Sequence, residues 1–300
     1  MRRDVTMFRI SILFIVILLP FVSQATVRVV TTLPDLADIT NAIGGERVNV
    51  DNIVRGNQNP HFIEVKPSYM MKVRRADIFI MVGMELELWA LQIIDGSRND
   101  RLDIVDLSTT DIEKLEVPTR VDRSQGDVHR FGNPHYWLDP RNIPLIAEAI
   151  LHALVKAAPD DEPYFRENMA AYLATLETKI AQWEELIAPL AGAKIITFHS
   201  SWSYFARWLN ITVSDQVEPK PGIPPSPSHT AELIDLVNEG EIRAIVVAPF
   251  YDLSAPAKIA QETTARVVIL STSVGGVDGT DNYMSMMDYN VRALYEAIQR

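Results

Sequence analysis

The sequence of 300 residues contains no cysteine. A chain without cysteine cannot be held together by disulfide bonds, so its fold must depend on a hydrophobic core. It also offers no cysteine that could carry a lipid at a cleavage site. We therefore expect a fold without covalent cross-links and a product without a lipid anchor.

Long hydrophobic runs are scarce, and the clearest one stands at the start of the chain. Three arginines (Arg2, Arg3 and Arg9) flank or precede the apolar stretch ISILFIVILLPFV, which ends in Ser-Gln-Ala. The stretch is too short to span a bilayer as a mature anchor, and its flanks are typical of a signal peptide. We expect cleavage after Ala25, which leaves 275 of the 300 residues as an exported protein of a bacterial periplasm.

Basic residues are few relative to acidic ones, with 28 Lys+Arg against 39 Asp+Glu. Removal of residues 1–25 takes away three arginines and one aspartate, which leaves 25 basic and 38 acidic residues and a net charge of −13. Such a surface repels nucleic acid and suits a small cation, although it serves solubility equally well. We expect no nucleic-acid partner.

Short β-branched runs alternate with helical stretches in two separate series. The first series holds VRVVT, VNVDNIV, DIFIMVG and DIVDL, and the second holds AKIITF, ITVSDQV, IRAIVVAPF and RVVIL. This alternation predicts βαβ units and parallel sheets. Between the series, apolar residues keep helical spacing, and no Gly or Pro occurs from 164 to 188. We predict an α/β fold of two lobes (26–158 and 191–300) joined by one long helix (159–190).

The chain has six histidines, and two of them share a local frame. Asn-Pro-His occurs at 59–61 and again at 133–135, and each proline stiffens the loop that carries the histidine. His199 directly follows a predicted strand, at the edge where open α/β sheets bind ligands. Three imidazoles on facing edges of two lobes favour a zinc-like ion over calcium or magnesium. We therefore predict a metal site made by His61, His135 and His199.

The other three histidines have simpler interpretations. His129 lies in the aperiodic segment 117–134, a loop too long to be a mere connector, and is expected to be solvated, with transient metal capture as the alternative. His152 is expected to pack or face solvent within a helix. His229 is expected to stand in the first turn of another helix.

The sequence resembles the metal-specific solute-binding proteins of bacterial ABC importers, which carry zinc or manganese. The resemblance covers nearly the whole mature chain, through segments that include VVTTLPDLADITNAIGGERVNV, NPHFIEVKPS, ADIFIMVGMELELW, NPHYWLDP, FHSSWSYFARWLN, IPPSPS and NYMSMMDYN. It implies two Rossmann-like lobes bridged by a rigid helix, with the ion between them. It also places the first three family ligands on His61, His135 and His199, and a histidine at this third position points to zinc.

The family's fourth ligand, an aspartate just after the last strand, is missing from this sequence. Thr272 stands in its place, and the nearest carboxylates are Asp278 and Asp281. Asp281 is the tentative fourth ligand, although a role as the N-cap of the last helix is favoured over ligation.

Three histidines with an open position are also typical of a zinc hydrolase or hydratase. The sequence contains no HExxH motif and no evident general base, which argues against an enzyme. A manganese carrier is another alternative. A binder of a chelated or organic ligand, lined by aromatic residues, is a further one (Trp89, Tyr136, Trp137 and Trp202). We predict a monomeric periplasmic protein that binds zinc as cargo, delivers it to an ABC permease and performs no chemistry on it.

Overall fold

The structure is a computed structural model that describes residues 26–118, 129–220 and 222–299. The expected signal peptide occupies residues 1–25 and therefore lies outside the described residues. Within the described ranges, none of the helices combines the length and the apolar character that a membrane crossing requires.

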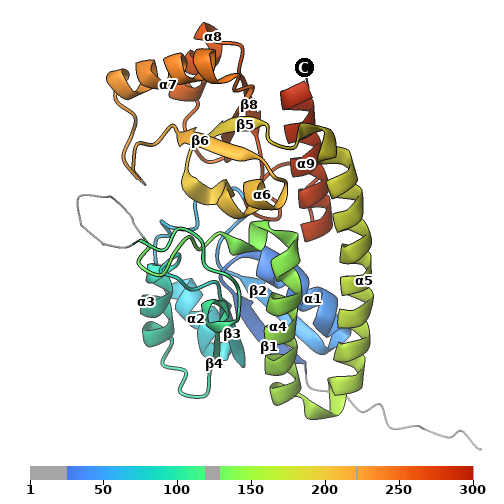
Figure 1. Cartoon of the computed structure of the whole chain (residues 1–300). Coiled ribbons are helices and arrows are strands. Elements are labelled where there is room, and N and C mark those ends of the chain that lie inside the picture. Colours follow the sequence, from blue (N-terminus) through green and yellow to red (C-terminus); the bar gives the residue numbers. More distant parts are fainter. Residues whose placement is uncertain (1–25, 119–128, 221, 300) are drawn as a thin grey trace, which may run out of the picture.

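Two four-stranded sheets, one in each lobe, form the framework of the molecule (Figure 1). All neighbouring strands are parallel, in the orders β2-β1-β3-β4 and β6-β5-β7-β8. The strands coincide with the β-branched runs of the sequence, so the predicted α/β fold with two parallel sheets is confirmed. Their bounds are β1 Val27–Thr31, β2 Val48–Asn52, β3 Ile78–Met81, β4 Asp103–Asp106, β5 Lys194–Thr197, β6 Thr212–Gln216, β7 Ala244–Val247 and β8 Arg266–Ile269.

Helices connect the strands and cover the sheets. Five of them have proline at the first or second helical position, where the missing N–H costs no intrahelical hydrogen bond. The shorter helices are α1 Pro34–Gly44, α2 Pro67–Arg75, α3 Leu88–Ser97, α4 Ile143–Ala157, α6 Ser203–Trp208, α7 Pro227–Gly240, α8 Ser254–Glu262 and α9 Tyr283–Gln299.

The long helix α5 (Glu162–Ile187) runs beside both lobes (Figure 1). It has 26 residues, which at ~1.5 Å per residue corresponds to ~39 Å. It packs against α1 and α4 at one end and against α9 at the other. Near that second end, Lys179 Nζ and Trp183 Nε1 donate hydrogen bonds to Asp288 of α9, at 2.6 and 2.7 Å. The predicted long connecting helix is confirmed, and these contacts attach it to both lobes.

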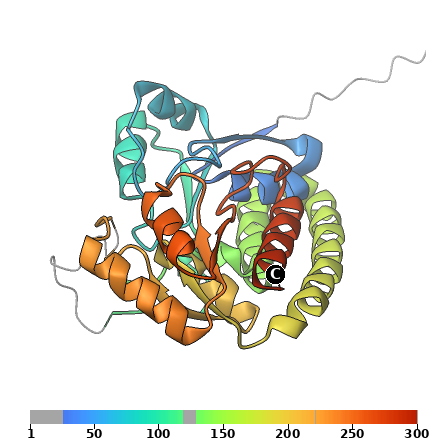
Figure 2. The ribbon, with the colours of Figure 1, turned by 90° about the horizontal axis from the view of Figure 1, so that it is seen from above.

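One hydrophobic core runs through both lobes. In the second sheet, Ile195 and Val246 belong to the same buried cluster as β1 and β3 of the first lobe. The alternate residues Ile196 and Ile245 face the other way and pack in a second cluster under α7 and α8. Viewed from above, α9 lies between the second sheet and α5 (Figure 2). Because the core is shared, the lobe boundaries at 158 and 191 remain a prediction.

A buried carboxylate lies at the junction of the two lobes. Asp35, near the start of α1, is inaccessible to solvent and accepts hydrogen bonds from the Ser273 hydroxyl and the Val274 N–H. Burial raises the pKa of Asp35 to about 7, although the hydrogen bond from Ser273 opposes the shift. The Asp35 carboxyl group is therefore protonated under mildly acidic conditions.

The substitution Asp35→Asn is expected to make the free energy of unfolding less dependent on pH. Between the unfolded pKa of ~3.9 and the folded value of about 7, the native state holds a proton that the unfolded chain releases. The contribution of Asp35 to stability is therefore greatest at acidic pH and falls as pH rises towards 7, by about 1.4 kcal/mol per pH unit.

Unfolding in urea at pH values from about 5 to about 8 measures this effect. Asparagine cannot ionise, so the variant should gain stability relative to the wild type as pH rises. If the difference in free energy of unfolding between the two proteins stayed constant over this range, the pKa of Asp35 would not be raised by burial.

Candidate metal centre

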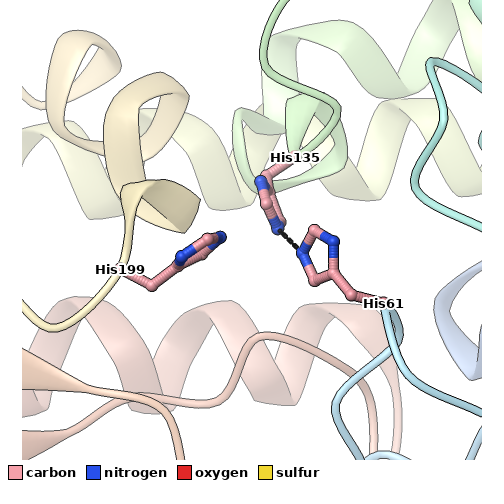
Figure 3. A group of neighbouring side chains, drawn as sticks. All are labelled: His61, His135 and His199. Atoms are coloured by element: carbon pink, nitrogen blue, oxygen red, sulfur yellow. Dashed lines mark hydrogen bonds between the residues drawn. The ribbon is translucent and has the colours of Figure 1, made fainter. Parts of the chain in front are cut away.

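Three histidines from three separate segments point towards one another (Figure 3). His61 lies between β2 and α2, His135 lies just before the turn Tyr136–Leu138, and His199 follows β5. Each offers one ring nitrogen, and the three nitrogens lie within 4.8 Å of one another. The structure therefore brings together the three residues that the sequence singled out.

The spacing suits a small ion with tetrahedral coordination. The Nε2 atoms of His61 and His135 are 3.2 Å apart. Zinc–nitrogen bonds of ~2.0–2.1 Å at tetrahedral angles set ligand nitrogens ~3.3 Å apart. This pair is already at about that separation, and the His199 nitrogen lies within 4.8 Å of both.

The repeated Asn-Pro-His frame is an Asx-type turn in both copies. The side-chain oxygen of Asn59 accepts the backbone N–H of His61 at 3.0 Å. That of Asn133 accepts the N–H of His135, also at 3.0 Å. Such turns fix the backbone two residues beyond the asparagine, while the proline between limits the remaining freedom. The frame is therefore repeated because it holds the backbone of a histidine in place.

Asn133 also sets the ring of His135. Its Oδ1 lies 2.9 Å from His135 Nδ1, and its Nδ2 donates to Ser200 O at 2.7 Å and to Glu116 Oε2 at 3.0 Å. These donor contacts identify Oδ1 as the acceptor, so Nδ1 of His135 carries the proton and Nε2 presents a lone pair. Because Ser200 follows His199, the same amide ties the two histidine segments together.

His199 is held by a carboxylate. Its Nδ1 lies 2.9 Å from Glu218 Oε2, and both residues are buried. The contact places the proton on Nδ1 and leaves a lone pair on Nε2. This Nε2 is buried and makes no hydrogen bond in the described part of the chain. The sequence pattern did not single out Glu218. It follows β6, which is parallel to and adjacent to β5, so it lies at the same edge of the sheet as His199.

Burial keeps two of the rings uncharged. The pKa of His61 and of His135 lies well below the usual value near 6.5, mainly because burial disfavours the imidazolium form. The neighbouring histidines lower both pKa values further. Neutral imidazole is the form that binds metal, so these two rings compete little with protons at neutral pH.

His129 lies closer to the site than expected for a solvated loop residue. Its ring stacks on the ring of His61, with centroids 5.1 Å apart. The next residue, Arg130, forms an ion pair with Glu85. Much of the loop between 117 and 134 lies outside the described residues, and pattern alone could not place His129 against His61.

The tentative fourth ligand is not brought to the histidines. Asp281 is exposed and does not belong to the group of possible ligands around them. Its alternative role as an N-cap is wrong, because Asn282 accepts the N–H of Ser285 at 2.9 Å at the start of α9. The residue at the family's aspartate position, Thr272, is buried, and its hydroxyl has no hydrogen-bond partner among the described residues.

The aromatic residues near the site belong to the core. Trp89 Nε1 donates to the carbonyl of Pro60 at 2.7 Å, and Trp137 Nε1 donates to that of Thr272 at 2.9 Å. These bonds support the loops that carry the site and leave the rings inside the protein. The alternative of an organic-ligand cleft lined by these residues is not supported, because all four are buried (Trp89, Tyr136, Trp137 and Trp202).

Comparison with known proteins identifies the family. The model of the family described as "Zinc-uptake complex component A periplasmic" matches residues 29–297. The chain is 25% identical to the manganese-binding lipoprotein MntA of Halalkalibacterium halodurans, over 88% of this chain and 86% of that protein. It is 23% identical to the zinc-binding lipoprotein AdcA of Streptococcus pneumoniae, over 91% of this chain but only 56% of AdcA.

Solved structures show the same architecture. A crystal structure of ZnuA superposes with a TM-score of 0.79 at 25% identity, and the match covers 91% of this chain and 99% of that one. A manganese-bound periplasmic metal-binding protein from Candidatus Liberibacter asiaticus matches with a TM-score of 0.77 at 19% identity, over 91% and 100% of the two chains. At that identity the likeness concerns the fold alone.

The names of the relatives correct the prediction on localisation. MntA, AdcA and the streptococcal relative PsaA are all named lipoproteins, which contradicts a product without a lipid anchor. That prediction rested on the absence of cysteine from the sequence. A location outside the cytoplasmic membrane still fits these relatives.

The family match over residues 29–297, together with three histidines converging between two parallel-sheet lobes, shows what the chain is. It belongs to the metal-specific solute-binding proteins of bacterial ABC importers, which are binding proteins and not enzymes.

Proposed function

We propose that the metal this importer component carries is zinc. The observation that supports zinc is the donor set: three imidazole nitrogens, with no carboxylate among the grouped ligands of the described residues. Manganese prefers carboxylate, carbonyl and water oxygens, whereas imidazole suits zinc. The relatives include both manganese-binding and zinc-binding proteins, so the proposal of zinc over manganese rests on the donor set.

The three histidines His61, His135 and His199 would bind the ion through Nε2. For His135 and His199 the proton on Nδ1 is already engaged by an oxygen acceptor, so binding requires no change of tautomer. The ion would link a loop of the first lobe to the strand end of the second. Its fourth position would remain open to water, which leaves a route for transfer to the membrane permease.

Zinc binding is expected at one ion per chain, with manganese weaker by at least about tenfold, because nitrogen donors bind zinc more tightly. Protein stripped of metal is titrated with zinc in competition with a chromophoric chelator, and manganese is then tested by displacement. Manganese binding as tight as zinc binding would contradict the zinc assignment and favour the manganese alternative.

Replacement of any one of the three histidines is expected to weaken zinc binding severely. His61→Ala, His135→Ala and His199→Ala each remove a ligand and should cost more than the ~10- to 100-fold typical of groups that only support a ligand. Asp281→Ala should leave zinc affinity nearly unchanged, because Asp281 is exposed and outside the group.

His152→Ala is the matched control, since His152 is exposed on α4 and pairs with Glu148 at 3.3 Å. Circular dichroism establishes that each variant folds. Wild-type affinity in any of the three site variants would rule out the three-histidine site. A loss in Asp281→Ala equal to that of a histidine variant would reinstate Asp281 as a ligand.

A further inference from the structure

Glu218 is a buried carboxylate that contacts a candidate ligand without being one. It is 7% exposed, and its Oε2 faces Nδ1 of His199, the nitrogen on the far side of the ring from the site. The N–H of Gly222 approaches the same oxygen at 3.4 Å. Glu218 is therefore directed at the histidine and is not part of the ligand group.

A local irregularity in the second sheet places Glu218 there. The pairing of β5 with β6 shifts between Ile195 and Ile196, so that Ile195 pairs with Val213 but Ile196 pairs with Asp215. Continued beyond the strands, this register sets Glu218, and not Val217, level with His199. Glu218 N–H also donates to the carbonyl of Phe198 at 2.9 Å, which fixes its backbone beside the histidine. Bulges of this kind commonly re-aim a side chain next to a functional site.

The candidate ligands of the site carry no negative charge, and Glu218 is a carboxylate beside one of them. Three neutral imidazoles would leave the full double charge of a bound ion uncompensated in a buried place, which is costly. The family's aspartate position holds Thr272, and among the described residues the ligand group contains no carboxylate. A carboxylate behind a ligating histidine fixes the ring and makes it a stronger donor.

We propose that Glu218 is a positioning residue of the metal site, which holds His199 with Nε2 free to bind and supplies negative charge through the ring. The proposal rests on the proposed function, since it assumes that His199 binds the ion. Glu218 would thus compensate part of the positive charge of the ion, as a carboxylate in the fourth ligand position would do.

Two variants of the full chain separate the hydrogen bond from the charge. Glu218→Gln keeps an acceptor for Nδ1–H but removes the charge, and Glu218→Ala removes both. Zinc affinity, measured by chelator competition at fixed neutral pH, is expected to fall by about 10-fold in the first and by about 100-fold in the second. Glu232→Gln is the control, because Glu232 is an exposed glutamate on α7 with a side chain 71% accessible.

A second measurement reports on position and not on overall fold. Long-range ¹H–¹⁵N spectra of the metal-free protein show which ring nitrogen of His199 carries the proton. The wild type and Glu218→Gln should show it on Nδ1, whereas Glu218→Ala should show a mixture of tautomers with the other histidines unchanged.

The possible outcomes distinguish this inference from the proposed function. Zinc affinity within about twofold of wild type in either variant, or an unchanged His199 tautomer in Glu218→Ala, would overturn the role of Glu218. Absence of a zinc site in the wild-type protein would instead overturn the proposed function. Loss of affinity in both variants, with the tautomer change in Glu218→Ala, is the result that supports the proposal.

Discussion

The site depends on keeping imidazole rings neutral and aimed before any ion arrives. Burial supplies the first requirement, because it lowers the pKa of His61 and His135 well below the usual value. Hydrogen bonds supply the second, because Asn133 and Glu218 engage the Nδ1 atoms of His135 and His199. At His135 and His199 the Nε2 lone pairs are therefore already directed into the site, and little side-chain entropy of these two rings remains to be lost on binding.

The rest of the fold maintains the distance between the two halves of this site. The helix α5 lies along both lobes, and one hydrophobic core passes from the first sheet to the inner face of the second. Because such cores are close-packed, large hinge motions would disrupt them. Asp35 and the segment after β8 add a buried polar contact across the same junction. The packing of the core and of α5 therefore holds the two lobes in a fixed arrangement around the three histidines.

Features set by local pattern could be predicted from the sequence, and features set by tertiary contact could not. Alternating β-branched runs and uninterrupted helical spacing gave the two parallel sheets and α5, and the repeated Asn-Pro-His frame gave two of the converging histidines. Glu218 escaped notice because its place beside His199 depends on a register shift within β6. The N-cap of α9 was misplaced by one residue, from Asn282 to Asp281, because both types cap helices equally well. The stacking of His129 on His61 joins segments 68 residues apart, which no local pattern encodes.

In the proposed function, imidazole nitrogens of His61, His135 and His199 together bind one zinc ion. X-ray absorption at the zinc edge of the loaded protein tests it most directly, because the outer-shell scattering of imidazole reveals how many histidines bind. We expect about three imidazoles at ~2.0–2.1 Å and one further light-atom ligand. A shell dominated by oxygen, with one imidazole or none, would contradict it.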